Sequence, residues 1–283
     1  MYREKSFAND LPHLVFVPTP IGNLEDMTFR AIKELKNADV IFAEDTRVTK
    51  KLLDHFEIVK PLRSFHEHNK AASTEEVLSH LRNNEVVALV SDAGMPIISD
   101  PGFELTEAVR SEGFIVYALP GSNALLTALV TSGIRAIPFS FLGFLDSKKS
   151  KRLEEITNLQ YKTETLIFYE APHRIEEVLE DFYAVFGSRK ACIARELTKL
   201  HEEIIVGDLS ELQHLENIKG EIVLIIEGYS TSDVTTNLSI VEQVDLFIEE
   251  GYKKTEAMKK VSVLTGIPKN KIYQEYLDNQ EKK

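Results

Sequence analysis

The most constraining feature of this sequence is an apolar run that leads into a long loop rich in glycine and proline. Residues 86–90, VVALV, predict a buried strand, and residues 91–102, SDAGMPIISDPG, separate it from a helix expected near Phe103. Connections between a strand and a helix usually need only about two to six residues. In open α/β sheets, ligands bind beyond the carboxyl ends of strands. The sequence therefore predicts a ligand-binding loop at 91–102, with an ordinary strand-to-helix turn as the alternative.

The same alternation of apolar runs and helical segments recurs along most of the chain. The strands that we expect lie at residues 13–17, 38–43, 86–90 and 114–118, and then at 165–169, 191–194, 203–206 and 221–227. One of the intervening helices is expected to open at residues 73–76, STEE, which match a capping box. Alternation this regular favours an α/β fold, with a mostly parallel sheet formed by the first set of strands.

Two changes in composition suggest domain boundaries. A lysine-rich segment at residues 148–152 follows the first set of strands, and a polar, Ser- and Thr-rich segment at 229–237 follows the second. We expect three domains, at 1–143, 144–230 and 238–283. The last one has the apolar spacing of three short helices, which resembles a helix-turn-helix module or else a bare three-helix bundle. Lys269 and Lys271 favour contact with nucleic acid.

The charge balance limits how the chain can bind nucleic acid. Its 283 residues carry a net charge of −12, which argues against generic attraction to phosphates. The excess of acid lies upstream of the tail, because residues 238–283 hold eight acidic residues and eight lysines. Basic clusters at 47–51 and 148–152 are either nucleic-acid contacts or solvated surface.

The single cysteine and the lack of a long apolar run indicate the compartment. Cys192 lies in the apolar run ACIA, so we expect a buried small side chain rather than a nucleophile. One cysteine cannot form an internal disulfide, which suits a reducing compartment. No run approaches the ~20 apolar residues of a membrane helix. The first ten residues include charged ones and no apolar segment of the kind found in signal peptides. We expect a cytoplasmic protein with no membrane contact.

Several polar clusters follow the predicted strands. Residues 44–47, EDTR, form either a polar site or a helix N-cap with a nearby ion pair. His66 and His68 have the spacing of possible metal ligands, but the remaining ligands of a zinc site are missing. Residues 18–23, PTPIGN, match neither a dinucleotide-binding nor a Walker phosphate loop.

Taken together, these motifs resemble the tetrapyrrole methylase superfamily, and specifically its ribosomal branch. The matching segments span about residues 14–228 and are PTPIGNL at 18–24, EDTR at 44–47, HEHN at 66–69, DAGMPIISDPG at 92–102, PGSNA at 120–124, FYEAPHR at 168–174 and ARELTK at 194–199. Met95 and Asn123 depart from the expected pattern. Both are neighbours of the presumed cofactor rather than its polar contacts.

The resemblance implies a fold, a reaction and partners. Two α/β domains would hold S-adenosylmethionine in the cleft between them, followed by a small helical module, and the chain would form a homodimer. The implied reaction is methylation of the ribose 2′-oxygen of a cytidine in 16S rRNA of the small ribosomal subunit, without a metal. Two alternatives are methylation of a tetrapyrrole ring and a non-enzymatic regulator that senses a ligand and binds DNA.

The resemblance also implies roles for individual residues. The cofactor-binding residues would be Pro20, Gly22, Asp92, Ala93, Gly94, Ser122 and Ala171. The candidates for the catalytic base are Glu170, Asp45, His66, His68 and Lys199, among which the sequence does not choose. The side chains expected to bind the RNA are Arg47, His68, Arg174 and Arg195.

Overall fold

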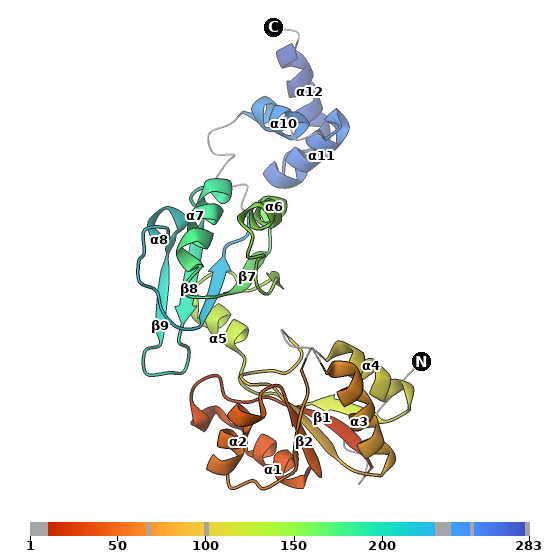
Figure 1. Cartoon of the computed structure of the whole chain (residues 1–283). Coiled ribbons are helices and arrows are strands. Elements are labelled where there is room, and N and C mark those ends of the chain that lie inside the picture. Colours follow the sequence, from red (N-terminus) through yellow and green to blue (C-terminus); the bar gives the residue numbers. More distant parts are fainter. Residues whose placement is uncertain (1–10, 67–68, 99–101, 230–238, 250–251, 281–283) are drawn as a thin grey trace. The chain divides into compact units, whose positions relative to one another are not determined.

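The computed structural model of the chain describes residues 11–66, 69–98, 102–229, 239–249 and 252–280. The chain forms two compact units (Figure 1). The larger unit holds residues up to Leu159 together with Thr165–Glu227, and the smaller holds Gln160–Glu164 and the residues from Gly228 onward. Among the described residues, no helix is long and apolar enough to cross a membrane.

The first sheet of the larger unit is entirely parallel, as the alternation of strands and helices predicted. Its strand order is β3-β2-β4-β1-β5, and every neighbouring pair runs in the same direction. The strands are β1 (His13–Val17), β2 (Val40–Ala43), β3 (Leu62–Ser64), β4 (Val87–Val90) and β5 (Ile115–Ala118). All five carboxyl ends therefore meet at one edge, where the predicted ligand loop begins.

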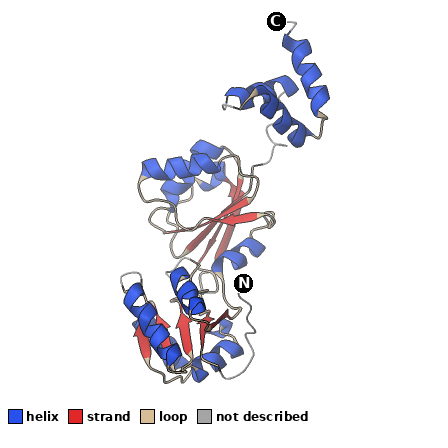
Figure 2. Cartoon of the chain, turned by 90° about the vertical axis from the view of Figure 1, so that its right-hand side faces the viewer, coloured by secondary structure: helices blue, strands red, loops and turns tan. Residues whose placement is uncertain are grey.

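Helices cover both faces of this sheet (Figure 2). The central strand β4 sends Val87 and Leu89 to one face and Ala88 and Val90 to the other, as the two-residue period of a strand requires. One face packs against α3 (Lys70–Arg82) and α4 (Phe103–Ser111), and the other against α1 (Phe29–Asn37) and α2 (Thr46–His55). A strand buried on both faces has an uninterrupted apolar sequence, which explains the run VVALV.

The second sheet, unlike the first, is mostly antiparallel. Its order is β6-β7-β10-β8-β9, and only β6 and β7 run parallel. The strands are β6 (Phe139–Phe141), β7 (Thr165–Glu170), β8 (Lys190–Arg195), β9 (Glu203–Asp208) and β10 (Ile222–Ile226). Strands β7 and β8 do point the same way across α7 (Ile175–Phe186), but β10 inserts between them in the opposite direction.

Helices also cover both faces of the second sheet. Helices α6 (Lys149–Leu159), α7 and α8 (Leu209–Leu212) pack on one face, and α5 (Ala124–Thr131) packs on the other. Helix α5 and strand β6 precede residue 144 in the sequence yet belong to this sheet. The predicted buried role of Cys192 is confirmed, because it lies in the core beneath α5 and burial raises the pKa of its thiol to about 11.

The capping box predicted at residues 73–76 was wrong. Helix α3 begins one turn earlier, at Lys70, with Asn69 as its N-cap. Ser73 is buried inside the helix and its hydroxyl donates to the carbonyl of Ser64, 2.9 Å away. Serine can bond backbone groups from a helix interior as well as from its start, so the sequence pattern alone did not separate the two positions.

The smaller unit contains three helices around an apolar core, as predicted. They are α10 (Ile240–Glu249), α11 (Lys254–Thr265) and α12 (Lys269–Gln280), and their core includes Val244, Phe247, Val261 and Ile272. Gly266 ends α11 in the left-handed conformation, with φ of 70°, which glycine adopts without strain.

A buried ion pair joins two helices of the second sheet and generates a stability prediction. The guanidinium of Arg152 on α6 is 1% exposed, and its Nε donates to Asp181 Oδ2 on α7 at 2.7 Å. Replacing Asp181 with alanine leaves this cation buried without its closest partner. We expect Asp181→Ala to lower the free energy of unfolding by about 3–5 kcal/mol.

Urea denaturation followed by circular dichroism measures this change. The matched control is Glu180→Ala at the exposed neighbouring position, which should change the free energy of unfolding by less than about 0.5 kcal/mol. Similar unfolding midpoints for the two variants would contradict a structural role for the Arg152–Asp181 pair.

Candidate functional site

Two loops at the carboxyl edge of the first sheet are bonded to each other through their backbones. The N–H of Thr19, just after β1, donates to the carbonyl of Gly94, and the N–H of Gly94 donates back to Thr19, both at 3.0 Å. The hydroxyl of Thr19 also donates to the carbonyl of Ser91 at 3.0 Å. Gly94 has φ of +82°, which side chains disfavour, so glycine suits this position. These bonds hold the predicted loop 91–102 against the PTPIGN loop.

The EDTR segment after β2 is a helix N-cap with an ion pair, one of the two alternatives that the sequence left open. The carboxylate of Asp45 accepts the backbone N–H of Arg47 at 2.8 Å, and the guanidinium of Arg47 forms two further bonds to it. These hydrogen bonds from Arg47 lower the pKa of Asp45 to about 2. The backbone N–H of Asp45 donates to Asp92 Oδ1 at 3.0 Å, which connects this segment to the predicted ligand loop.

Glu170 lies at the carboxyl end of β7 in the second sheet, and its side chain is fully buried. Its Oε1 accepts the backbone N–H of Ala171 at 2.8 Å and lies 3.5 Å from the Nε of Arg174. Its Oε2 is buried and has no hydrogen-bond partner in the described part of the chain. Burial raises the pKa of Glu170, and the nearby N–H group and Arg174 offset this only in part. This carboxyl group is therefore set to exchange a proton or to bind a ligand.

Gly22 brings the first loop against the second sheet's ARELTK segment. A Cβ atom on Gly22 would lie 2.4 Å from Cγ of Lys199 and 2.9 Å from the hydroxyl oxygen of Thr198. Only glycine permits this approach. Lys199 itself bonds Glu196 at 2.9 Å and Glu221 at 3.1 Å. Burial opposes its charge, but these two carboxylates raise the pKa of Lys199 above its ordinary value.

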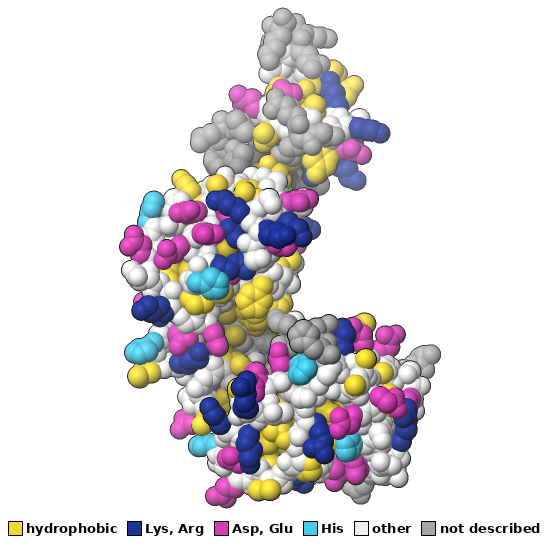
Figure 3. Space-filling view, in the orientation of Figure 1, with side chains coloured by type: hydrophobic (Ala, Val, Ile, Leu, Met, Phe, Trp, Pro, Cys, Tyr) yellow, Lys and Arg dark blue, Asp and Glu magenta, His cyan; other side chains and the backbone are white. Residues whose placement is uncertain are grey.

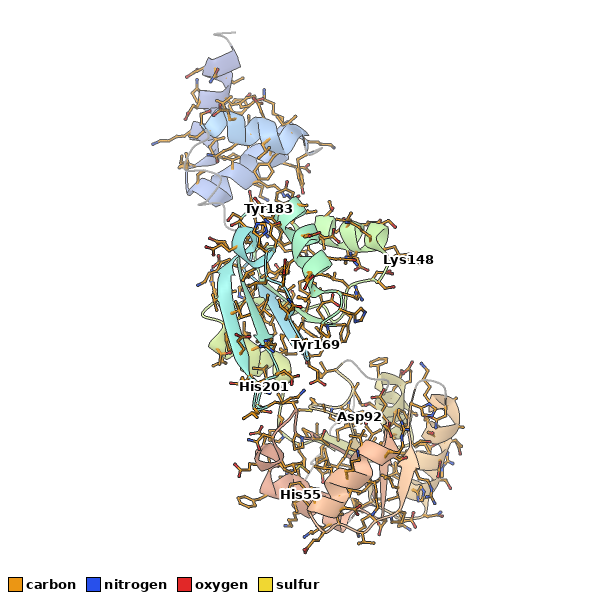
Figure 4. The ribbon with its side chains drawn as sticks, turned by 60° about the vertical axis from the view of Figure 1, so that its left-hand side comes forward. His55, Asp92, Lys148, Tyr169, Tyr183 and His201 are labelled. Atoms are coloured by element: carbon orange, nitrogen blue, oxygen red, sulfur yellow. The ribbon has the colours of Figure 1, made fainter. Side chains whose placement is uncertain are left out.

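The ends of both sheets enclose a cavity of about 480 Å³. Asp92 and Tyr169, labelled in Figure 4, lie on its two sides, one from each sheet. The ring of Tyr169 packs edge-on against Phe144, with their centroids 5.8 Å apart. Figure 3 shows apolar side chains gathered beside the hollow on the face that it draws. The described lining residues are Ile21, Glu44, Asp92, Ala93, Ala124, Phe144, Tyr169, Glu170, Ala171, Pro172, Leu197, Glu221, Ile222 and Val223.

The structure brings together four of the predicted site residues in this cavity, namely Asp92, Ala93, Glu170 and Ala171. Pro20 and Gly22 line a neighbouring cavity of about 250 Å³, which also contacts Asp92. Gly94 lines a third, small space of about 40 Å³ beside Asn123 and Ala124. Ser122 lies next to them in sequence, and its hydroxyl donates to the carbonyl of Asp26 at 3.4 Å.

The predicted substrate-binding and remaining catalytic residues that the structure describes do not line the cavity. Arg174 donates to the carbonyls of Leu145 and Asp146, and Arg195 pairs with Glu203 at 2.5 Å. Arg47 pairs with Asp45, although its side chain is 87% exposed. The backbone of His66 is bonded to Asn69. His68 lies outside the described residues.

Several lining residues were not selected from the sequence. Tyr169 and Glu44 stand beside selected residues within FYEAPHR and EDTR, so their motifs were an available signal. Phe144, Leu197 and Glu221 come from three separate segments, and the fold alone brings them to one cavity. Glu221 lies just before β10, whose insertion between β7 and β8 the sequence did not indicate.

The cavity is suited to a positively charged ligand with apolar parts. Four carboxyl side chains line it, from Glu44, Asp92, Glu170 and Glu221, and its described lining includes no lysine or arginine. The remaining lining is largely aliphatic or aromatic. A ligand that carries a cationic centre would meet these acids and the unpartnered Oε2 of Glu170.

Comparison with known proteins places the chain in a family. A family profile described as Tetrapyrrole (Corrin/Porphyrin) Methylases matches residues 13–213. The chain is 45% identical to the Ribosomal RNA small subunit methyltransferase I of Bacillus subtilis (strain 168), covering 97% of this chain and 98% of that protein. It is 46% identical to the protein of the same name from Halalkalibacterium halodurans, covering 95% and 96% respectively.

Solved structures share the fold at lower identity. A crystal structure of diphthine synthase superposes with a TM-score of 0.59 at 13% identity, covering 77% of this chain and 90% of that one. The cobalt precorrin-4 methyltransferase CbiF superposes with a TM-score of 0.58 at 16% identity, covering 76% and 94%. These similarities support the two-sheet α/β fold that the resemblance implied.

The buried carboxyl group of Glu170 predicts a characteristic pH dependence of stability. Because its pKa is raised in the folded chain, the folded state holds a proton that the unfolded state has lost above the ordinary pKa of 4.5. Its contribution to stability is therefore present at low pH and declines as pH rises through the raised pKa. We expect Glu170→Gln to remove this decline.

Thermal unfolding of both proteins from about pH 4 to pH 8 measures the effect. Wild-type stability relative to Glu170→Gln should fall as pH rises. Glu154→Gln, at an exposed position on α6, provides the control and should show a constant difference. A wild-type advantage that grows with pH would mean that Glu170 is stabilised as a carboxylate.

Proposed function

Because this chain belongs to the tetrapyrrole (corrin/porphyrin) methylase family and is a methyltransferase, we propose that it methylates the 2′-oxygen of a cytidine ribose in 16S rRNA. The methyl donor in this proposal is S-adenosylmethionine. The substrate is the small ribosomal subunit, in keeping with the names of relatives that are 42–46% identical over nearly their whole length. The observation that carries the proposal is the acid-lined cavity at the ends of both sheets.

The residues of this cavity fit S-adenosylmethionine. The cofactor carries a sulfonium and an ammonium group, and four carboxyl side chains line the cavity to meet positive charge. Its volume of about 480 Å³ is within the range of pockets for ligands of this size, and its lining is largely apolar, as in such pockets. When bound, the cofactor supplies an activated methyl group. Asp92, Ala93, Gly94 and Ala171 would hold it, together with Pro20, Gly22 and Ser122 nearby.

Glu170 is the strongest candidate for the base that removes the proton of the ribose hydroxyl. Its Oε2 has no partner in the described part of the chain, and burial raises its pKa. A base with a raised pKa accepts a proton more readily near neutral pH. Asp45 is a weaker base because its pKa is about 2, and Lys199 is held as a cation by two carboxylates. His66 remains a candidate at the end of β3.

Recognition of the RNA would depend on shape and on a few placed cations, because the net charge of −12 opposes generic phosphate binding. Arg47, Arg174, Arg195 and His68 are the proposed contacts. The exposed Lys269 and Lys271 at the start of α12 would add contacts from the C-terminal helices. We therefore expect the folded subunit, rather than free RNA, to be the substrate.

Further parts of the proposal concern assembly and location. Exposed apolar side chains on α5 and the segment into β6 support a homodimer, because monomers rarely leave such groups in solvent as a patch. They are Leu126, Val130, Ile137 and Phe139. We also propose domains at 1–143, 144–230 and 238–283, with α5 and β6 of the first domain packing on the sheet of the second. A cytoplasmic location and a reaction without a metal complete the proposal. Among the described residues, no group of three or more His, Cys, Asp and Glu side chains could hold a metal ion.

The direct test is transfer of labelled methyl from S-adenosylmethionine to unmethylated small ribosomal subunits. We expect incorporation at the ribose of one cytidine of 16S rRNA, and little into naked 16S RNA, duplex DNA or a tetrapyrrole at matched salt. Activity should survive prolonged treatment with a chelator that leaves the subunit intact. Methylation of a base, or equal activity on naked RNA, would contradict the assigned chemistry or the particle requirement respectively.

A second test concerns the cofactor loop. Asp92→Ala removes a carboxylate from the cavity, and hydrogen bonds to charged groups contribute about 1.5–3 kcal/mol. We expect cofactor affinity, measured by calorimetry, to fall by about tenfold to a hundredfold. Asp39→Ala is the matched control, because Asp39 also accepts a backbone N–H but lies at the opposite edge of the same sheet. Unchanged affinity in Asp92→Ala would remove this loop from the site.

A further inference from the structure

The second cavity, of about 250 Å³, lies beside the cofactor cavity and shares Asp92 with it. The PTPIGN loop supplies Thr19, Pro20 and Gly22 to its lining, and helix α2 supplies Val48, Thr49, Lys51 and Leu52. Its volume is below the about 300–1,000 Å³ of pockets for drug-sized ligands. It therefore suits one ring system rather than a complete cofactor.

The lining of this cavity combines apolar and polar residues. Leu24, Val48 and Leu52 form apolar lining against which a flat ring can pack. The hydroxyls of Thr19 and Ser91 are already used, since they donate to the carbonyls of Ser91 and Gly94.

Thr49 is the buried polar group of this cavity that is left without a partner. The residue is 2% exposed, and its Oγ1 has no hydrogen-bond partner within the described chain. An unsatisfied buried hydroxyl usually costs stability, unless a ligand satisfies it. Thr49 is also one of the residues that line the cavity.

The lining of the cavity also includes Lys51, a cation without an acidic partner among the described residues. Lys50 is paired with Asp54 at 2.5 Å and Arg47 with Asp45 at 2.6 Å, whereas Lys51 makes no ion pair with any described residue. Lys51 is exposed and lines the cavity. The apolar lining suits the base of one nucleotide, and the hydroxyl of Thr49 and the ammonium of Lys51 suit its polar edge and its phosphate.

We propose that this cavity binds the pyrimidine base of the nucleotide that is methylated. This inference rests on the proposed function. In one nucleotide the base and the 2′-oxygen are attached to adjacent carbons of the same ribose. A base held between α2 and the PTPIGN loop would place its own ribose beside Asp92, facing the cofactor cavity. Thr49 would bond the edge of the base, Leu24, Val48 and Leu52 would pack on its faces, and Lys51 would meet its phosphate. The base would leave its stack in the RNA to enter.

The first test replaces a lining residue with a larger one that fills the cavity. Val48 is 44% exposed, so Val48→Phe should fold normally while its ring occupies the slot. We expect the KM for small subunits to rise at least about tenfold, with cofactor affinity unchanged. Val59→Phe, at an 88% exposed position outside the cavity, is the matched control and should match the wild type. A Val48→Phe variant with normal KM, or with weakened cofactor binding, would overturn the proposal.

Two finer substitutions separate the roles within the cavity. Thr49→Val removes the unpartnered hydroxyl, so it should leave thermal stability unchanged or raised while lowering kcat/KM by about fivefold. Lys51→Ala should raise KM and weaken its dependence on salt, whereas Lys36→Ala, an exposed lysine on α1, should do neither. Full activity in both Thr49→Val and Lys51→Ala would overturn the proposal.

A binding measurement separates this inference from the proposed function. Cytidine 5′-monophosphate at millimolar concentration should shift the NMR signals of the methyl groups of Leu24 and Leu52 in the wild-type chain but not in Val48→Phe. Such shifts in a chain that fails to methylate subunits would support the nucleotide pocket and reject the proposed reaction. An active wild-type enzyme with no shift of these methyl groups would overturn the pocket and leave the reaction standing.

Discussion

The site depends on the backbone pairing of Thr19 with Gly94. Two hydrogen bonds of 3.0 Å hold the loop after β1 against the loop after β4, and the Asp45–Asp92 bond attaches the segment after β2. Three strands of a parallel sheet thus present their loops as one connected surface. Both cavities are lined by this surface, and Asp92 belongs to each of them. Small changes at Gly94 or Asp92 would therefore affect the proposed cofactor and substrate sites together.

The two cavities differ in the charged residues that line them. The larger is lined by four acids, which suits a cationic methyl donor, while the smaller has a lysine at its mouth, which suits an RNA phosphate. Two other proposed RNA contacts are already oriented by protein acceptors, since Arg174 donates to two carbonyls and Arg195 to Glu203. A chain of net charge −12 can therefore act on RNA if its few available cations are well placed.

The two sheets contribute differently to the proposed reaction. The first supplies the connected loops, and the second supplies Glu170, whose burial raises its pKa, and the aromatic pair Phe144 and Tyr169. Gly22 allows the two sheets to approach at Lys199, since any larger residue would collide with that side chain. Glu170, the proposed base, and Asp92 and Ala93 of the proposed cofactor loop are thereby brought to one cavity from segments 77 or more residues apart in sequence.

By itself, the sequence determined eight of the ten described strands, with β3 and β6 not expected, and also most helices, a candidate ligand loop and the family. Apolar period and loop motifs are local properties. It also identified Asp92, Ala93, Glu170 and Ala171 as site candidates, and the structure brings these four to one cavity. Only the tertiary structure decided that β10 inserts between β7 and β8, that Asp45 is an ion-paired N-cap, and that Thr49 is buried without a partner. Strand order, pKa and burial depend on contacts between distant segments, which no local pattern specifies.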